Sequence, residues 1–153
     1  MEKTKHILNG KTEELDWYSP LMKGYLRGIC RELKEKDLRH SSVYGTMLVL
    51  DSMTRKGARI YIMALSKRYR LIDVDLAHMS LIDDKELFVE KIEEWAEFTG
   101  AEYIIIGKIG YLADYMEELR YANDLFGSLK KAKLYDYVTV DGDSYRSYME
   151  KLR

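Results

Sequence analysis

Residues 101–107, AEYIIIG, are the segment that most restricts how this chain can fold. A strand with three consecutive isoleucines presents apolar side chains on both faces, which is typical of a central strand buried within a sheet. A helix is expected just before it, over 84–99, because Asp83 and Asp84 place carboxylates at its start and Gly100 supplies a stop. The chain is therefore expected to form a sheet with helices packed on it.

The first half of the chain predicts one helix and three strands. The helix is expected over 20–37, because a Ser-Pro pair is typical of a helix start and apolar residues follow at helical spacing. The apolar, partly β-branched segments 43–50 and 58–65 flank a turn-like sequence, which predicts a β-hairpin. Alternating residues over 69–79 predict the next antiparallel strand.

The last third of the chain is expected to be mainly helical. Its pattern predicts helices over 112–123 and 124–132, a strand over 135–140, a turn at residues 141–142 and a closing helix over 144–152. Together the segments predict an α+β fold, with a mainly antiparallel four- to five-stranded sheet, helices packed on it and a helical C-terminal third.

Length and composition suggest one intracellular domain. A chain of 153 residues lies in the range of a single domain, so we expect one α+β domain over 1–153, with 1–18 as a loose N-terminal arm. The single Cys30 indicates a reducing compartment, and neither a secretory signal nor an apolar run of ~20 residues is seen. A cytoplasmic protein without a membrane partner is expected.

The chain carries two neighbouring blocks of opposite charge that its formal net charge of -1 conceals. Residues 21–70 hold 12 Lys/Arg against 4 Asp/Glu, whereas residues 71–124 hold 4 against 14. Clustered charge creates a directional field, and no complete catalytic set accompanies it. We therefore expect a small non-catalytic protein that engages nucleic acid, or a nucleic-acid-handling protein, through polarised charged faces.

The basic block supplies the cations and the aromatic ring that a nucleic-acid surface needs. No zinc-finger spacing, glycine-rich phosphate loop or RNA-recognition motif accompanies them, and the cations of the block can instead lie on different sides of the domain or face its acidic half. The predicted phosphate contacts are Lys23, Arg27, Arg31, Arg59, Lys67, Arg68 and Arg70, with Tyr69 as a stacking platform.

The acidic block contains a helix with a row of glutamates that roughly mimics a run of phosphates. A protein with a cationic channel is the partner expected for such a row, which would suit an inhibitor or accessory factor encoded by a phage or mobile element. A solvated helix face is the simpler explanation, and self-association of the two charge blocks is a third possibility. The residues of this predicted protein-binding row are Glu86, Glu90, Glu93, Glu94 and Glu97.

Two tetrapeptides, HSSV at 40–43 and HMSL at 78–81, share the pattern His, any residue, Ser or Thr, apolar. The pair resembles the signature of the 2H phosphoesterases, in which two such strands face each other across a cleft. By this resemblance the alternative function is a phosphoesterase acting on a nucleotide. His40 and His78 would act as acid and base, and Ser42 and Ser80 would hold the phosphoryl oxygens.

A second resemblance concerns metal binding. EEWAEFTGAEYIIIGKIGY, at 93–111, resembles the helix and strand that follow the metal loop in RadC-type JAB proteins. The His-x-His-Pro segment and the later Asp of that loop are missing, so the resemblance implies no zinc site. Asp51, Asp73 and Asp75 are candidate Mg²⁺ ligands of a nuclease, although capping or solvent exposure explains them more simply. We expect no metal and no cofactor.

Overall fold

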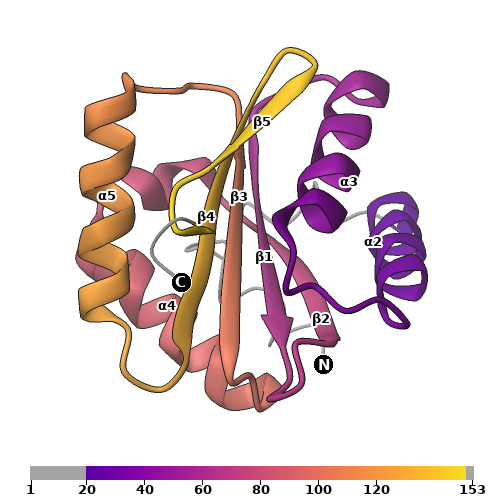
Figure 1. The fold of residues 1–153 in the computed structure, drawn as a ribbon, viewed down its shortest axis with the longest axis horizontal. Helices are drawn as coiled ribbons and strands as arrows, with labels where there is room; N and C mark the ends of the chain where they lie inside the picture. Colours follow the sequence, from indigo (N-terminus) through magenta and orange to yellow (C-terminus); the bar gives the residue numbers. More distant parts are fainter. Residues whose placement is uncertain (1–19, 151–153) are drawn as a thin grey trace.

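The computed structural model describes the backbone of residues 20–150 and the side chains of residues 24–150, so the predicted arm at 1–18 lies outside it. Helices cover both faces of one twisted sheet (Figure 1). The elements are α2 (Pro20–Leu33), α3 (Ser41–Thr54), β1 (Arg59–Leu65), β2 (Leu71–Ala77), the 3₁₀ helix η3 (Met79–Asp83), α4 (Lys85–Thr99), β3 (Tyr103–Ile109), α5 (Tyr115–Ser128), β4 (Lys133–Asp141) and β5 (Ser144–Ser147).

The sheet has five strands in the order β2-β1-β3-β4-β5, which places β3 at its centre as its three isoleucines predict. β1 pairs antiparallel with both β2 and β3, β4 pairs antiparallel with β5, and only β3 and β4 are parallel. The predicted α+β class is therefore confirmed, with a mixed, mostly antiparallel sheet.

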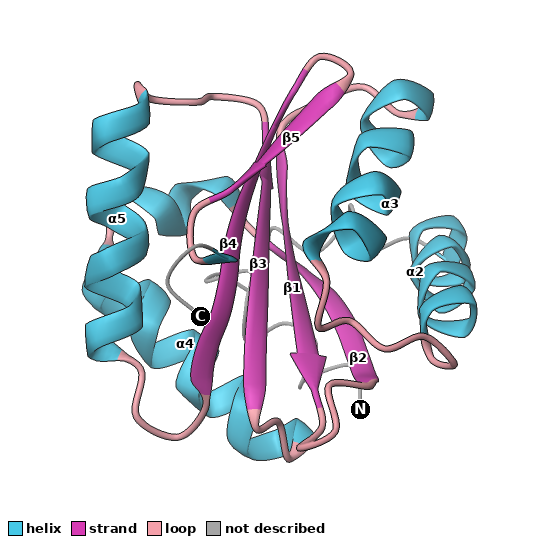
Figure 2. Ribbon diagram, viewed as in Figure 1, coloured by secondary structure: helices cyan, strands magenta, loops and turns pink. Residues whose placement is uncertain are grey.

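The two faces of the sheet are covered by different parts of the chain (Figure 2). On one face α2 and α3 bury a core that includes Tyr44, Leu48 and Ile105. On the other face α4, α5 and η3 bury a second core that includes Trp95 and Ile106. We call these the α2/α3 layer and the α4/α5 layer. Because β3 contributes to both cores, its unbroken apolar character follows from its central place.

Helix α4 follows the prediction closely. The Asp84 side chain accepts the backbone N–H of Leu87 as an N-cap, and Gly100 ends the helix in the left-handed conformation with φ of 76°. Phe88, Ile92 and Trp95 form its buried side at helical spacing. The predicted antiparallel pairing of segments 58–65 and 69–79 is likewise confirmed, as β1 and β2.

The prediction of a strand over 43–50 is wrong, because these residues lie inside α3. The buried residues of α3 include Tyr44, Leu48 and Asp51, which are spaced by four and three positions as on one side of a helix. A short apolar run with β-branched residues suits either structure, and burial against the sheet decides in favour of the helix. The first helix also ends earlier than predicted, at Leu33.

The prediction of a helical C-terminal third is also wrong. One uninterrupted helix, α5, replaces the two helices predicted over 112–132, and the predicted closing helix begins instead as strand β5. The predicted turn at Asp141 and Gly142 is confirmed, with Gly142 at φ of 63°, and it folds β5 back along β4. There Tyr145 packs on α3 so closely that a Cβ at Gly45 would lie 2.6 Å from its ring.

None of the helices in the described part of the chain is both long enough and apolar enough to cross a membrane.

Candidate nucleic-acid interface

The loop after α2 is held against the β1–β2 turn at one end of the sheet, which we call the turn end. The backbone N–H of Leu38 donates to the carbonyl of Tyr69 at 3.0 Å, and Asp37 forms an isolated β-bridge with Arg70. Arg70 also donates from Nη1 to the carbonyl of Glu35, 35 residues away in the chain, at 2.5 Å. Two distant segments therefore form one continuous surface.

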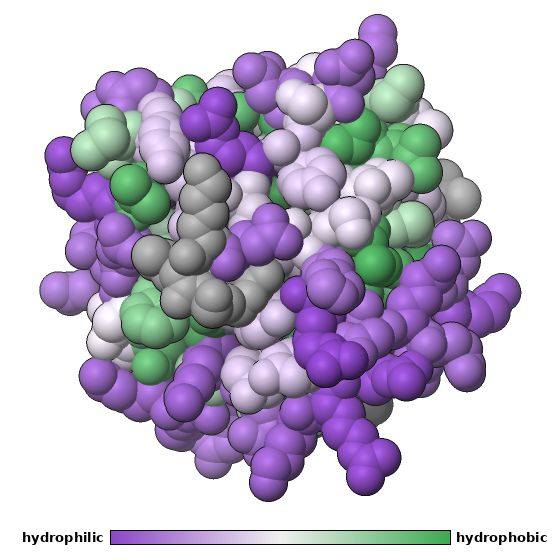
Figure 3. Space-filling view, viewed as in Figure 1, coloured by the Kyte–Doolittle hydropathy of each residue, from purple (hydrophilic) through white to green (hydrophobic). Residues whose placement is uncertain are grey.

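Exposed cations from α2, its loop and the β1–β2 turn gather on this surface. Eight cations lie there among three carboxylates, those of Glu32, Glu35 and Asp37, so positive charge predominates. Figure 3 shows hydrophilic side chains over the lower right of the molecule, where α2 and its loop lie. We call this set the basic strip, which comprises Arg27, Arg31, Lys34, Lys36, Arg39, Lys67, Arg68 and Arg70.

One ion pair lies within the basic strip. Nη2 of Arg39 is 2.7 Å from Oδ2 of Asp37, and Nε of Arg39 donates to the same oxygen at 2.8 Å. The hydrogen bond from the Arg39 side chain lowers the pKa of the Asp37 carboxyl below its ordinary value. Both groups are solvent-accessible, so the pair shapes the loop more than it stabilises the fold.

Three tyrosines pack together beneath the loop at the turn end. Tyr69 stacks on Tyr103 with ring centroids 4.7 Å apart, and Tyr135 lies 5.1 Å from Tyr69 and 5.6 Å from Tyr103. The hydroxyl of Tyr135 donates to the carbonyl of Arg39 at 2.9 Å, and the Arg39 guanidinium lies 6.0 Å from the Tyr69 ring. The cluster therefore supports the basic loop, and Tyr69 is not an open platform for a base.

Sequence reasoning missed Tyr103 and Tyr135, because they lie in the first residues of β3 and β4 and come near Tyr69 only in the folded sheet. The hydrogen bond with Tyr69 raises the pKa of the Tyr103 hydroxyl above its ordinary value. The sequence does contain 13 tyrosines against 3 phenylalanines, but this composition does not show which tyrosine rings contact one another.

The predicted phosphate contact at Arg59 is wrong. Arg59 is 6% exposed, and its Nε and Nη2 donate to Oδ2 of Asp51 at 2.9 and 2.6 Å. It lies on the side of β1 that faces α3, where a buried cation needs a carboxylate partner. The side chain of Lys23, another predicted contact, lies outside the described residues. The remaining predicted phosphate contacts all belong to the basic strip, and they are Arg27, Arg31, Lys67, Arg68 and Arg70.

The two charge blocks occupy different layers of the molecule. Residues 21–70 form α2, α3 and β1, whereas the acidic block supplies α4 and α5 on the opposite face of the sheet. The α2 cations of the basic strip therefore lie on the opposite face of the sheet from the acidic helices, and those of the β1–β2 turn lie at the turn end.

The predicted acidic row is partly used inside the molecule. Glu93 accepts backbone N–H groups of Lys130 and Lys131 at 3.0 and 3.2 Å, and Glu97 pairs with the Lys131 ammonium. These contacts join α4 to the loop before β4. The members that remain directed at solvent are Glu86, Glu90 and Glu94.

The structure does not bring the two His-x-Ser segments together. His40 precedes α3 at the turn end, two residues after the Leu38 contact with Tyr69. His78 follows β2 at the opposite end, so the seven residues of β2, about 23 Å at 3.3 Å each, separate them. His78 instead caps η3, with Nδ1 2.7 Å from the Ser80 hydroxyl. The facing strands of the 2H arrangement are not formed.

The three candidate magnesium ligands have other roles. Asp51 pairs with Arg59, while Asp73 and Asp75 each accept, at 2.8 Å, the backbone N–H of the residue that follows them, Val74 and Leu76. No group of three or more His, Cys, Asp or Glu residues within the described part of the chain is arranged to hold a metal ion.

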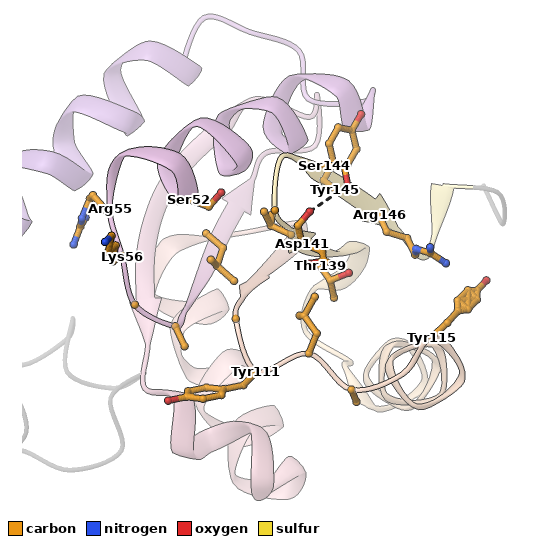
Figure 4. Close-up of a pocket in the computed structure, with 18 of the residues that line it drawn as sticks. Ser52, Arg55, Lys56, Tyr111, Tyr115, Thr139, Asp141, Ser144, Tyr145 and Arg146 are labelled. Carbon is orange, nitrogen blue, oxygen red and sulfur yellow. Dashed lines mark hydrogen bonds between the residues drawn. The ribbon is translucent and has the colours of Figure 1, made fainter.

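A groove of about 990 Å³ lies at the other end of the sheet, beyond the carboxyl ends of β3 and β4 (Figure 4). We call this the groove end. Sequence reasoning missed it, because its walls come from three loops that only the folded sheet brings together.

Comparison with known protein families finds no model that matches this chain, and comparison with curated proteins finds no relative. The proposals below therefore depend on the geometry alone.

Proposed function

We propose that this protein binds the phosphate backbone of nucleic acid through the basic strip. The observation that carries the proposal is the attachment of the α2 loop to the β1–β2 turn by the Leu38 and Arg70 hydrogen bonds. This attachment brings the exposed cations of the α2 loop beside those of the β1–β2 turn, and several neighbouring cations are what releases the counterions of a polyanion.

The surroundings of the strip favour contacts that do not depend on base sequence. The Tyr69 ring is stacked on Tyr103 and has Arg39 beside it, so it is already engaged within the protein. Arginine and lysine contacts to phosphate position a protein but carry no sequence information themselves. Binding is therefore expected to vary little with base sequence.

A duplex is the form of nucleic acid that should bind the strip more tightly. A duplex carries one negative charge per ~1.7 Å of its axis, twice the density of a single strand. Tighter binding to a duplex than to the matching single strand is expected from this difference in charge density.

The test is fluorescence anisotropy with a labelled random-sequence duplex of about 20 base pairs and with its single strand. If roughly six cations contact phosphates, the affinity should fall about 1000-fold between about 50 and 200 mM salt. The variant Arg27→Glu/Arg31→Glu should abolish binding, since it reverses the two charges that α2 contributes to the strip.

The matched control is Lys91→Glu/Lys130→Glu, which changes the net charge by the same amount in the α4/α5 layer. It should retain most of the affinity. Equal losses in the two variants would mean that total charge governs binding, and an affinity insensitive to salt would exclude phosphate contacts. Either result contradicts the proposal.

A further inference from the structure

The groove at the groove end is built from loops on both sides of β3. The segment between α3 and β1 forms one wall, the β4–β5 hairpin forms the opposite wall, and the loop from Gly110 to Ala113 forms the base. The carboxyl ends of adjacent parallel strands are where α/β proteins commonly bind small ligands. A volume of about 990 Å³ is at the upper end of the range for such sites.

Cations predominate in the walls of this groove. Arg55 and Lys56 extend from the end of α3, and Arg146 extends from β5 on the other side (Figure 4). Asp141 is the only acidic residue among the described side chains that line the groove. The lining therefore favours an anion, and cations on both walls can contact charges at two ends of one ligand.

Two of these cations are already aligned by aromatic rings. The Arg55 guanidinium lies 4.4 Å from the ring centroid of Tyr25, and its Nη1 is buried without a hydrogen-bond partner in the described residues. The Arg146 guanidinium lies 4.8 Å from the centroid of Tyr115. Cation–π contacts restrict both side chains, so less conformational entropy is lost when an anion binds.

Tyr111 is displayed on the base of the groove in an unusual way. It is 80% exposed and has a left-handed backbone with φ of 51°, directly after Gly110 at φ of 86°. Gly110 is required there, because a Cβ would lie 2.8 Å from the Cβ of Ala58. A left-handed non-glycine residue is strained by about 1–2 kcal/mol, and such strain is often found at binding sites.

The Tyr111 ring makes no ring-stacking or cation–π contact with the described residues. This distinguishes it from Tyr115, which stacks on Tyr148 at 5.6 Å besides holding Arg146. An exposed aromatic face beside a cationic wall is the combination that a base with a phosphate requires.

The geometry points to a nucleotide site in this groove, with the base stacked on Tyr111 and the phosphate group held by Arg146, on the wall opposite Lys56. The site does not depend on the basic strip, which lies mainly at the turn end. The shared chemistry is a phosphate joined to a base, which either a free mononucleotide or the end of a nucleic-acid strand supplies.

The test is isothermal titration with AMP, ATP, adenosine and inorganic phosphate. AMP or ATP should bind with a millimolar or lower Kd, more tightly than adenosine or phosphate alone, because only nucleotides contact both the ring and the cations. Tyr111→Asn removes the ring while keeping a residue that tolerates the left-handed backbone, and it should weaken AMP binding at least about fivefold. Arg146→Glu should weaken ATP binding by more.

The variant Arg27→Glu/Arg31→Glu separates this site from the proposed function. It should bind AMP as the unaltered protein does, even if it has lost duplex binding. In the same variant, a 5′-phosphorylated dinucleotide that binds more tightly than AMP would identify a strand end as the ligand, and weaker binding would identify the free nucleotide. Each of these results supports the site.

Three results would overturn the nucleotide site. One is the absence of binding heat for AMP and ATP at millimolar concentration. Another is an AMP affinity unchanged by both Tyr111→Asn and Arg146→Glu, which would place binding elsewhere. The third is inorganic phosphate binding as tightly as AMP, which would leave no role for the base. Lys91→Glu/Lys130→Glu is again the matched charge control and should bind AMP normally.

Discussion

Each helical layer contains a buried ion pair, and in both layers the pair joins a strand of the sheet to a helix. In the α2/α3 layer, Arg59 of β1 contacts Asp51 of α3, with nitrogen and oxygen 2.6 Å apart. In the α4/α5 layer, Lys108 of β3 contacts Glu118 of α5 at 2.9 Å. In both pairs the strand supplies the cation and the helix the carboxylate, and all four residues are buried.

The pairs differ in the number of hydrogen bonds that the side chain of the cation donates. Arg59 donates to Asp51 and also to the carbonyls of Gly57 and Arg55, so it fastens the whole connection between α3 and β1. Among the described residues the Lys108 ammonium donates one hydrogen bond, while Glu118 also accepts from the backbone N–H of Ala113 and the hydroxyl of Tyr137. In one pair the cation is the centre of the network, and in the other the carboxylate is.

The largest effect is expected from Arg59→Met, which removes the centre of the first network. Asp51 would stay buried with its charge uncompensated, and the carbonyls of Gly57 and Arg55 would lose their donor. We expect a loss of about 3–5 kcal/mol in the free energy of unfolding, measured by urea denaturation. Arg59→Lys, which keeps the charge without the planar donor set, should recover only part of this loss. Full recovery would show that charge alone matters.

Lys108→Met should have a smaller effect, because the Lys108 ammonium donates to Glu118 alone among the described residues, whereas Arg59 also donates to the carbonyls of Gly57 and Arg55. We expect a loss of about 3 kcal/mol, at the low end of the range for one partner of a buried pair. The double variant Lys108→Met/Glu118→Met leaves no unpaired charge and should be more stable than Lys108→Met alone. A double variant that is less stable would show that the pair contributes stability beyond neutralising its own charges.

The tyrosine hydroxyls give a finer comparison of the two networks. Tyr61 donates to Asp51 and Tyr137 to Glu118, both at 2.8 Å. Asp51 also accepts from Arg59 and Tyr25, so Tyr61→Phe should be the milder change. We expect about 1.5 kcal/mol for Tyr137→Phe and less for Tyr61→Phe, again from urea denaturation. The reverse order would mean that the Asp51 network is the less redundant one.

At alkaline pH both networks should weaken, because each contains a buried tyrosine hydroxyl that donates to the carboxylate. Burial, with the neighbouring carboxylate, raises the pKa of Tyr61 and of Tyr137 above the ordinary 10.0. A group whose pKa is raised in the folded state contributes stability that is complete below 10.0 and is lost as the pH rises further. Phenolate absorbance should show these two tyrosines ionising only with unfolding. Ionisation of either one at its ordinary pKa in the folded protein would contradict its burial.

Short sequence patterns correctly predicted the ends of α4 and the central position of β3. Asp84 and Gly100 mark the ends of α4, and the three isoleucines of β3 identify the central strand, because capping and two-sided burial act within a few residues. Residues 43–50 were misassigned because a short apolar run fits a strand or a helix, and contact with the sheet selects the helix.

The candidate sites were predicted less well than the fold, since they depend on contacts between distant segments. The cations at Lys67, Arg68 and Arg70 were identified because a turn exposes its side chains. Arg59 was assigned to the surface because composition does not show that helices cover both faces of β1. The groove around Tyr111 has no sequence motif, and only the juxtaposition of three loops creates it.

The carboxylates of Asp73 and Asp75 have a consequence for the backbone of β2. Each accepts the N–H group of the residue that follows it, Val74 and Leu76, on a strand whose residues 74–77 are buried. A buried main-chain donor without an acceptor is costly, so these two side chains satisfy locally a requirement that pairing with another strand meets elsewhere in the sheet.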